Sequence, residues 1–497
     1  MVARSQPWDQ RAAWAVVTIV CLASAWLRFR FLADFETPVG IDGYYYPIQV
    51  RSLSESGNLY YPSAPLVPWL MWLASAFTDP ITGCKLVAAL GTATIGLPVL
   101  GVCRRLELAP WPSAAAAVMA TTSGSSLYLS VEFAKSGVGL TVAMFALWAV
   151  LAGQGRPAAH KSARESLKSW ALPLIAVLAA VLAHKLATAV LVILAAPMVV
   201  AKARRSRRWL IGSIAAVVAL AVVGLLMPER FLSPAALSPL KTMWTWKPTL
   251  TAAIYDPGGQ PLSFGGDVML AAAAAVAALI ASWRLQFRTS PVIVGAAIFA
   301  LIIALPFVNV ADTNGLGPRL RLLAFIPGAL CTAAALDAAS RRLTWLGPAV
   351  FLGIVAGLVF ARPRAPGDGV VVPHPQMLRA LALMPDSLIG PQTVVIIPDR
   401  QLVFASVWMH RVESRRRPEG TEPQRRVRLL PAWATTPELV SAIRSATAQP
   451  APGVPAPVAL DPGQPLTLTA VREPTWEWLL TQVPPAQRDR LRRWPTP

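Results

Sequence analysis

The residues of this chain best suited to chemistry lie in a short polar stretch that follows the first long apolar run. Asp42 precedes Gly43, which lets the backbone approach a ligand, and Tyr44, whose ring and hydroxyl can hold a sugar. Arg51 follows about two turns later if Tyr44 begins a helix. Such a cluster beside a membrane segment predicts a binding or transfer site. The alternative is a helix-capping aspartate within an interfacial belt of tyrosines.

A second acidic point, Glu132, is followed three residues later by Lys135. Two carboxylates from separate loops can divide the work, because one can deprotonate an acceptor hydroxyl while the other orients it or holds a metal. Asp42 is therefore the predicted base or acceptor-orienting group, and Glu132 its assistant. A divalent ion such as Mg²⁺ or Mn²⁺ would use these two acids, although the sequence does not establish a cofactor. The alternative for Glu132 is a local i,i+3 ion pair with Lys135.

Several cations could bind an anionic phosphate. His184 and Lys185 interrupt a long apolar stretch, and Arg319 and Arg321 open a later one. A guanidinium binds phosphate through two parallel hydrogen bonds, which makes these arginines candidate clamps. The alternative is that they anchor the helix ends at the membrane interface. The predicted substrate-binding residues are Tyr44, Arg51, Lys85, Lys135, His184, Lys185, Arg319 and Arg321.

The composition indicates a membrane protein with many spans. Of 497 residues, 55% are hydrophobic and only 14% charged, and the mean hydropathy is +0.51. The net charge of +20 does not indicate nucleic acid, because the basic residues form short clusters between apolar runs, as orientation signals do. The four cysteines are scattered, so neither a disulfide framework nor a zinc site is expected.

Apolar runs predict about eleven transmembrane helices, and the first is expected to be an uncleaved span. The run at 64–77 is shorter and carries prolines at its start, so we interpret it as a juxtamembrane or re-entrant helix. The predicted spans are 12–28, 84–101, 111–127, 137–153, 169–184, 186–201, 209–227, 267–283, 290–309, 321–337 and 344–361.

The distribution of positive charge predicts the orientation. If 64–77 does not cross the membrane, the clusters at 104–105, 154–168, 202–208, 284–288 and 341–342 all fall on one side, together with the N-terminus. Cytoplasmic loops carry such clusters, so the N-terminus is predicted to be cytoplasmic. The external face then holds the loops 29–83 and 228–266. The domain prediction is a membrane domain at 1–361 with those two loops and an extracytoplasmic α/β domain at 362–497.

The predicted C-terminal domain has few long apolar runs and more proline and arginine. Short β-rich stretches occur at 393–397 and 402–404, and 450–465 is a proline-rich connector. The chain contains no nucleophilic triad, Walker loop or dinucleotide fingerprint, which argues against ATP-driven transport and cytoplasmic nucleotide-sugar chemistry. We expect the C-terminal domain to support the membrane domain or to contact the acceptor.

In the order of these features the chain resembles the GT-C superfamily of membrane glycosyltransferases. An acidic external loop follows the first span, a second acidic loop contains Glu132, and a helix pair turns at His184. Asp42-Gly43-Tyr44 is similar to the first acidic motif of prokaryotic oligosaccharyltransferases, whose aspartate binds a divalent metal and helps activate the acceptor. The resemblance implies a GT-C-like helical fold, a polyprenyl-phosphate-linked sugar donor and a glycan, lipid or protein acceptor.

Two features differ from the oligosaccharyltransferases. Trp476-Glu477-Trp478 is not their Trp-Trp-Asp acceptor motif, and Glu132 has no second acid beside it. Transfer of a single hexose or pentose at the extracytoplasmic face of the cell membrane therefore fits better than protein N-glycosylation. Two alternatives stay open. One is a non-catalytic protein of the same fold, either a scaffold or a transporter of lipid-linked precursors, and the other is an oligosaccharyltransferase.

Overall fold

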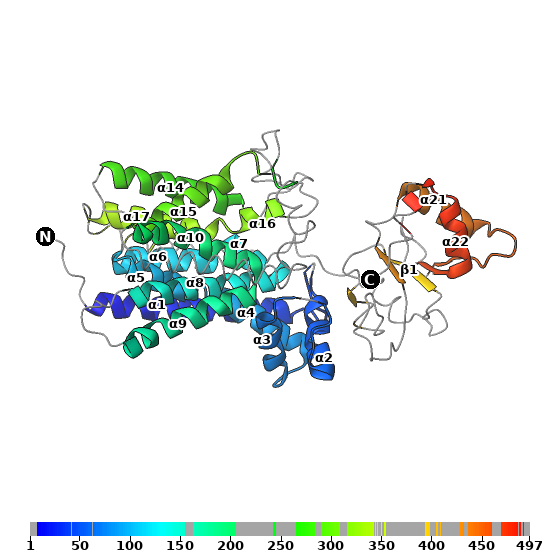
Figure 1. Ribbon diagram of the computed structural model, residues 1–497, viewed down its shortest axis with the longest axis horizontal. Helices are drawn as coiled ribbons and strands as arrows, with labels where there is room; N and C mark the ends of the chain where they lie inside the picture. The colour runs from blue at the N-terminus through cyan, green and yellow to red at the C-terminus, as the bar shows by residue number, and fades with distance from the viewer. Residues whose placement is uncertain are drawn as a thin grey trace. The chain divides into compact units, whose positions relative to one another are not determined.

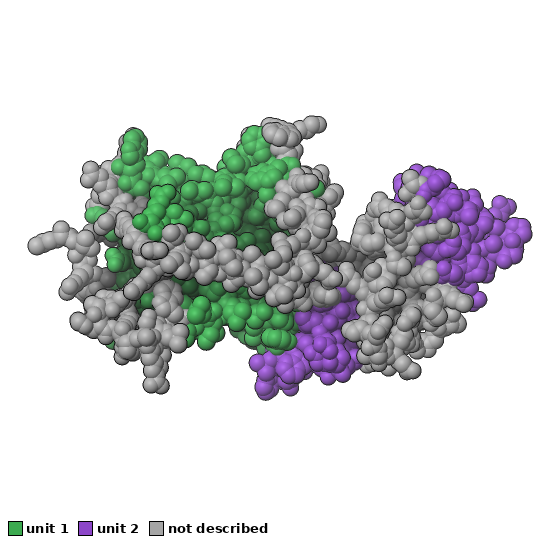
Figure 2. Space-filling model, viewed as in Figure 1, with its two compact units in different colours: residues 1–34, 63–70, 85–369 green, residues 35–62, 71–84, 370–497 purple. Residues whose placement is uncertain are grey.

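The computed structural model describes most of the first 341 residues and several shorter pieces of the rest. The longer described stretches are 7–40, 42–61, 63–154, 163–204, 265–284, 290–308, 316–341, 436–459 and 469–485. The chain divides into two compact units, which Figure 2 colours separately. Unit 1 holds Met1–Asp34, Ser63–Leu70 and Lys85–Gly369, and unit 2 holds Phe35–Pro62, Met71–Cys84 and Val370–Pro497.

Unit 1 is a bundle of α-helices, which Figure 1 shows lying side by side. The helices pack in the pairs α1–α6, α5–α6, α8–α9, α10–α15 and α14–α17, and alanines fill much of the core between them. The main helices are α1 (Pro7–Ala33), α4 (Pro80–Ala93), α5 (Gly96–Arg105), α6 (Pro110–Thr122), α7 (Gly124–Glu132), α8 (Ala134–Gln154), α9 (Ala163–Ala183), α10 (Lys185–Ala203), α14 (Gly265–Arg284), α15 (Pro291–Ala304), α16 (Leu316–Leu322) and α17 (Phe325–Ser340).

Six helices among the described residues are long and apolar enough to cross a membrane. α4 and α5 together form one of them, as do α16 and α17, and both are longer than the spans expected at 84–101 and 321–337. The expected spans at 169–184 and 290–309 correspond to shorter apolar helices, and the one at 111–127 corresponds to α6. The expected span at 209–227 lies outside the described residues, and most of 344–361 does too.

The juxtamembrane prediction at 64–77 coincides with α3 (Leu66–Ser75). Its 10 residues extend roughly 15 Å, about half the thickness of the hydrocarbon core. Trp69, Trp72 and Leu73 are exposed on it. A short helix with exposed tryptophans suits the membrane interface, where the indole ring is buried and its N–H reaches water.

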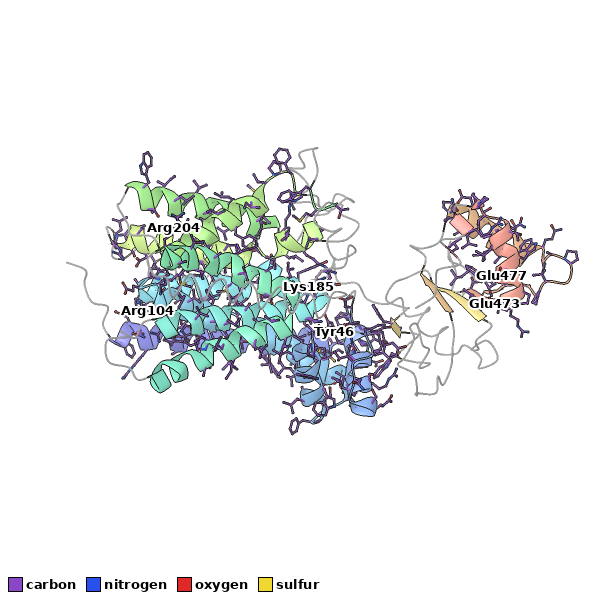
Figure 3. All side chains as sticks on the ribbon, viewed as in Figure 1. Tyr46, Arg104, Lys185, Arg204, Glu473 and Glu477 are labelled. Carbon is purple, nitrogen blue, oxygen red and sulfur yellow. The ribbon has the colours of Figure 1, made fainter. Side chains whose placement is uncertain are left out.

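The two ends of the bundle differ in which residues they present. Figure 3 shows Arg104, at the end of α5, and Arg204, after α10, at one end, and Lys185 toward the other. Because neighbouring helices reverse direction, Glu132 at the end of α7 and Arg319 in α16 lie toward the Lys185 end. Arg104 and Arg204 thus lie toward the opposite end of the bundle from Lys185.

Unit 2 combines α2 (Tyr45–Ser56) with a small C-terminal sheet. The sheet has the order β2-β1-β4-β3, from Arg428–Pro431, Thr393–Ile397, Thr469–Arg472 and Val458–Ala459. β1 pairs in parallel with β2 and antiparallel with β4. Helices α21 (Pro437–Ala448) and α22 (Glu473–Thr481) contribute its core with Leu439 and the buried Trp476. Trp476 is therefore a core residue.

The β-rich pattern at 393–397 is confirmed as β1, whereas Phe404 is helical and not part of a strand. Phe404 lies 5.8 Å from both Tyr45 and Tyr61, measured between ring centroids. Packing against these rings explains its apolar character, which on the sequence favours a strand. Leu402 and Val403, which belong to the same predicted run, lie outside the described residues.

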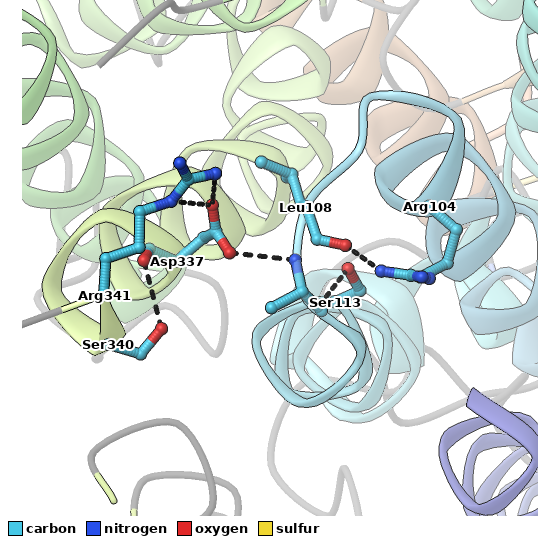
Figure 4. Close-up of polar contacts among 7 residues, drawn as sticks. Arg104, Leu108, Ser113, Asp337, Ser340 and Arg341 are labelled. Atoms are coloured by element: carbon cyan, nitrogen blue, oxygen red, sulfur yellow. Dashed lines mark hydrogen bonds and ion pairs between the residues drawn. The ribbon is translucent and has the colours of Figure 1, made fainter. Parts of the chain in front are cut away.

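A buried carboxylate fastens α17 to the start of α6. Asp337 is 2% exposed, and its Oδ1 accepts a hydrogen bond from the backbone N–H of Ala109 at 2.9 Å (Figure 4). Its Oδ2 pairs with Arg341 at 3.1 Å. The free N–H groups at a helix start carry partial positive charge, so this carboxylate caps α6 from another helix.

We predict that Asp337→Ala lowers the free energy of unfolding by about 1–2 kcal/mol, because it removes the cap of α6. Arg341→Ala should cost less than about 1 kcal/mol, since the Arg341 side chain is 49% exposed and its ion pair is screened by water. Denaturant unfolding of the detergent-solubilised protein measures both. Equal losses in the two variants would contradict the capping role.

Candidate active site

The site in unit 1 begins at two breaks in the helix sequence α6, α7 and α8. Ser123 ends α6 and caps α7, since its hydroxyl accepts a hydrogen bond from the N–H of Ser126 at 3.1 Å. Phe133 then leaves helical geometry, with φ −136° and ψ 54°. Glu132 is consequently the last residue of α7 and Lys135 the second residue of α8. The break at Phe133 thus separates these two residues onto different helices.

Glu132 is 1% exposed, although it stands at a helix C-terminus, where the partial negative charge disfavours a carboxylate. Tyr128 lies one turn before it. The pKa of Tyr128 is raised to about 12, mainly by burial and also by the nearby Glu132, while Arg319 acts in the opposite direction. Glu132 and Arg319 therefore both lie near the Tyr128 hydroxyl. A buried acid in an unfavourable helix position, with a cation nearby, is typical of a functional site.

Arg319, on α16, reaches the α7–α8 break. Its guanidinium carbon lies 4.7 Å from the centroid of the Phe133 ring, within the range of a cation–π contact. The ring thus holds the cation beside Glu132 while leaving guanidinium N–H groups for other partners. Sequence reasoning found Arg319 but not Phe133, because an aromatic residue next to Glu132 has no distinctive spacing.

His184 links α8 to the turn between α9 and α10. It is extended, with φ −166° and ψ 132°, and its Nδ1 accepts a hydrogen bond from the N–H of Leu186 at 3.3 Å. The other ring nitrogen, Nε2, lies 3.4 Å from the Ser136 hydroxyl. In the neutral ring Nδ1 is therefore the acceptor, and Nε2 carries the proton and donates it to Ser136. The imidazole caps α10 and orients Ser136.

Burial is the largest cause that lowers the pKa of His184 to about 3. Neighbouring positive charges lower it in the same direction, and they belong to Lys135, Arg319 and Lys185. Lys135, Lys185 and Arg319 therefore all lie near the His184 ring, and these four predicted site residues come from three segments far apart in the sequence. His184 itself is neutral at physiological pH, so it adds hydrogen bonds to the cluster and no positive charge.

Close packing of α8 against the α9–α10 turn depends on Gly139. A Cβ at that position would lie 2.7 Å from the Cβ of His184, which is shorter than real contacts of this kind. Only glycine allows the two backbones this approach. Lys135 of the same helix donates a hydrogen bond to the hydroxyl of Ser63. The start of α8 is thereby fixed to two other segments.

Arg321 lies two residues after Arg319 and is fully buried. Its Nη2 donates to the carbonyl of Val308 at 3.1 Å, while Nε and Nη1 have no hydrogen-bond partner among the described residues. A buried guanidinium with unused N–H groups is costly unless an anion completes it. Lys85, the remaining cation predicted for unit 1, is partly buried on α4.

Asp42 belongs to unit 2, in the turn before α2. The N–H of Gly43 bonds to the carbonyl of Gly40 at 2.9 Å, and that of Tyr45 bonds to the carbonyl of Asp42 at 3.0 Å. A Cβ on Gly43 would lie 2.7 Å from the Val39 carbonyl oxygen, so this tight turn requires glycine there. The N-cap of α2 is Tyr44 and not Asp42. Asp42 is partly buried, and its role stays a prediction.

The other two predicted residues of unit 2 are held by the protein. Tyr44 is buried, which raises its pKa to about 12. Arg51 donates to the carbonyl of Trp408 at 2.6 Å, and its guanidinium carbon lies 4.8 Å from the centroid of the Trp408 ring. Arg51 thus connects α2 to a segment more than 350 residues later. The described contacts give it a structural task, and substrate binding by either residue stays a prediction.

No group of three or more His, Cys, Asp or Glu side chains that could hold a metal occurs in the part of the chain that the structure describes. Asp42 belongs to unit 2 and Glu132 to unit 1, and a divalent ion bound by these two acids stays a prediction.

Comparison with known proteins shows similarity at the level of structure. No protein-family model matches the sequence, and no curated protein does. The solved oligosaccharyltransferase of Archaeoglobus fulgidus, in its apo form, matches with a TM-score of 0.52 and 15% identity over 76% of this chain. ArnT from Cupriavidus metallidurans, also apo, matches with a TM-score of 0.39 and 14% identity, covering 93% of this chain and 98% of ArnT.

This chain covers 58% of the length of the archaeal enzyme. An identity of 15% is too low to transfer an activity, but the structural match extends over three quarters of the chain. The fold predicted from the sequence is confirmed at this level: the chain is a helical, multi-pass membrane protein whose fold is similar to that of the archaeal oligosaccharyltransferase.

Proposed function

We propose that this protein transfers a sugar from a polyprenyl-phosphate-linked donor to an acceptor at the extracytoplasmic face of the membrane. The observation that supports this best is the cluster at one end of the bundle, where a buried acid lies among cations from three separate segments. We call Glu132, Lys135, His184, Lys185 and Arg319 the end cluster. The GT-C fold adds support, because the similar solved proteins include an oligosaccharyltransferase.

The end cluster suits a reaction in which a phosphate leaves. The acceptor hydroxyl loses its proton to a carboxylate and attacks the anomeric carbon, the bond from that carbon to the phosphate oxygen breaks, and the configuration inverts. Lys135, Lys185 and Arg319 would bind the phosphate and stabilise the charge that develops on it. Arg321, whose Nε and Nη1 have no hydrogen-bond partner among the described residues, is a further candidate for this contact. Such cations need no displacement during reaction because Phe133 and Ser63 hold two of them.

The roles of the acids remain as the sequence predicts. Asp42 is the proposed base or acceptor-orienting group, and Glu132 assists it. Glu132 is suited to orient an acceptor hydroxyl near the phosphate cations, since the break at Phe133 fixes its position at the end of α7. The sugar is a hexose or a pentose, and the N-terminus is cytoplasmic in this proposal, in line with Arg104 and Arg204 at the end of the bundle away from Lys185.

The second candidate is a non-catalytic protein that binds or moves lipid-linked precursors. The cations of the end cluster suit it equally well, but it gives Glu132 no task. An oligosaccharyltransferase is a third candidate. Buried Trp476 makes the Trp476-Glu477-Trp478 stretch a poor acceptor site, which disfavours it.

We predict that Arg319→Ala weakens binding of a polyprenyl monophosphate about 10- to 100-fold, the loss expected for a charge-assisted hydrogen bond. Farnesyl phosphate is a suitable probe, measured by calorimetry on the purified protein in detergent. Arg204→Ala, at the opposite end of the bundle, is the matched control and should bind normally. Unchanged binding in the Arg319 variant would rule out phosphate binding by the end cluster.

Glu132→Gln should retain farnesyl phosphate binding but lower sugar transfer about tenfold or more, because a neutral amide holds the acceptor hydroxyl more weakly than a carboxylate does. Transfer is measured with a panel of polyprenyl-phosphate-linked hexoses and pentoses. Glu107→Gln, an exposed acid after α5, provides the control. If the Glu132 variant transfers sugar at the normal rate, the non-catalytic candidate is favoured.

Asp42→Ala should abolish transfer by the same panel while expression and folding stay normal, since Asp42 is neither a helix cap nor a core residue. Glu55→Gln, an exposed acid on α2 of the same unit, is the control. Full activity in the Asp42 variant would exclude it as the base.

The neutral state of His184 makes stability depend on pH. Its folded pKa of about 3 lies below the ordinary value of 6.5, so between these values the unfolded chain binds more protons. Stability should therefore fall as the pH drops below about 6.5, by at most roughly 1.4 kcal/mol per pH unit from this residue. His184→Asn, which can still cap α10, should reduce this acid sensitivity. Unfolding at pH 7.5 and 5 compares the two proteins, and an identical pH dependence would contradict a neutral, buried His184.

A further inference from the structure

The start of α7 is fixed by a carboxylate from a helix far away in the sequence. Asp267, in the first turn of α14, accepts a hydrogen bond from the backbone N–H of Ser125 through Oδ2 at 2.7 Å. Ser125 is the second residue of α7, and its backbone N–H is one of the groups left unpaired at a helix start. A carboxylate there is favoured, because the N-terminal end of a helix carries partial positive charge.

Arg28 of α1 holds the same junction from the side of α6. The side chain is 4% exposed, and Nη2 donates to the carbonyl of Thr121, at the end of α6. Nη1 donates to the Thr92 hydroxyl at 2.9 Å and to the carbonyl of Ser126 at 3.2 Å, and Nη2 also reaches the Ser126 hydroxyl at 3.1 Å. The cation thus contacts the negative end of α6 while the carboxylate contacts the positive end of α7.

Asp267 is not needed for α7 to form, because Ser123 already caps the helix through the N–H of Ser126. What the carboxylate adds is a tertiary connection that fixes where α7 begins relative to α14. α7 has nine residues, or roughly 13 Å, and Glu132 is its last residue. So short a helix moves as one body, and a displacement at Ser125 is carried to Glu132.

We propose that Asp267 is a positioning residue for Glu132, acting through Ser125 and the length of α7, with Arg28 as the second fixed point of the same junction. This rests on the proposed function in that Glu132 takes part in transfer. The claim that Asp267 fixes the position of α7 does not rest on that function, since it concerns the geometry of α7 alone. Asp267 carries no direct role in the chemistry.

The chain offers a matched comparison. Asp337 caps α6 from α17 as Asp267 holds α7 from α14, and the two bonds to backbone N–H groups are similar in length, 2.9 and 2.7 Å. Loss of either carboxylate removes one bond of the same kind. Only Asp267 acts on the helix that carries Glu132, so the two variants separate positioning from general stability.

The experiment combines hydrogen exchange with kinetics on the full-length protein in detergent. In Asp267→Ala, exchange in a peptide covering 124–133 should rise about tenfold and kcat for sugar transfer should fall about tenfold, while farnesyl phosphate binding stays within about twofold. Asp267→Asn keeps an oxygen acceptor, so its α7 exchange and its kcat should both return most of the way to the wild-type values. Asp337→Ala should lower stability but leave kcat and α7 exchange within about twofold.

Unchanged exchange in α7 of the Asp267→Ala variant would overturn the proposal, as would an equal fall of kcat in Asp337→Ala. If the wild-type protein transfers no sugar from the panel, the proposed function fails. The exchange comparison then still decides whether Asp267 positions α7, because it requires no substrate.

Discussion

Ionised side chains at the ends of a membrane helix bundle are costly unless each meets a partner of opposite charge, and this constraint explains most of the polar structure described here. Helix ends are readily available partners, because they present unpaired N–H and carbonyl groups. The side chains of Arg28, Asp267 and Asp337 each form a hydrogen bond to a backbone group at a helix end. Each uses one side chain to connect a helix to another that is distant in the sequence.

The charged residues of the end cluster have other kinds of partner than helix ends. Arg319 lies against the Phe133 ring and Lys135 donates to the Ser63 hydroxyl, while Nε and Nη1 of Arg321 have no hydrogen-bond partner among the described residues. With three cations and one acid, the cluster carries an excess of positive charge. Binding of an anionic head group would complete it, which is why we connect the end cluster with a phosphate-linked donor.

Two of the residues predicted to bind substrate also have structural roles among the described contacts. His184 is a neutral helix cap, and Arg51 fastens α2 to Trp408. The buried Arg28 donates hydrogen bonds to backbone and hydroxyl oxygens of three helices. Residue type and position in the sequence therefore identify candidate substrate-binding residues. The number of contacts that each makes within the protein shows which of them also have a structural role.

Hydropathy and residue periodicity, which act over a few consecutive residues, determined from the sequence the class of membrane protein with many spans, the short interfacial helix α3 and the strand β1. The expectation of a GT-C fold came from a resemblance in the order of the loops and in the Asp42-Gly43-Tyr44 motif. The sequence also pointed to Glu132, Lys135, His184 and Arg319, but as separate candidates. That these four are neighbours depends on the tertiary structure. The helix breaks at Phe133, Gly139 lets α8 pack closely against His184, and Arg319 of α16 contacts Phe133. The roles of Asp267 and Phe133 arise only there, since a bond between residues 142 positions apart leaves no local pattern in the sequence.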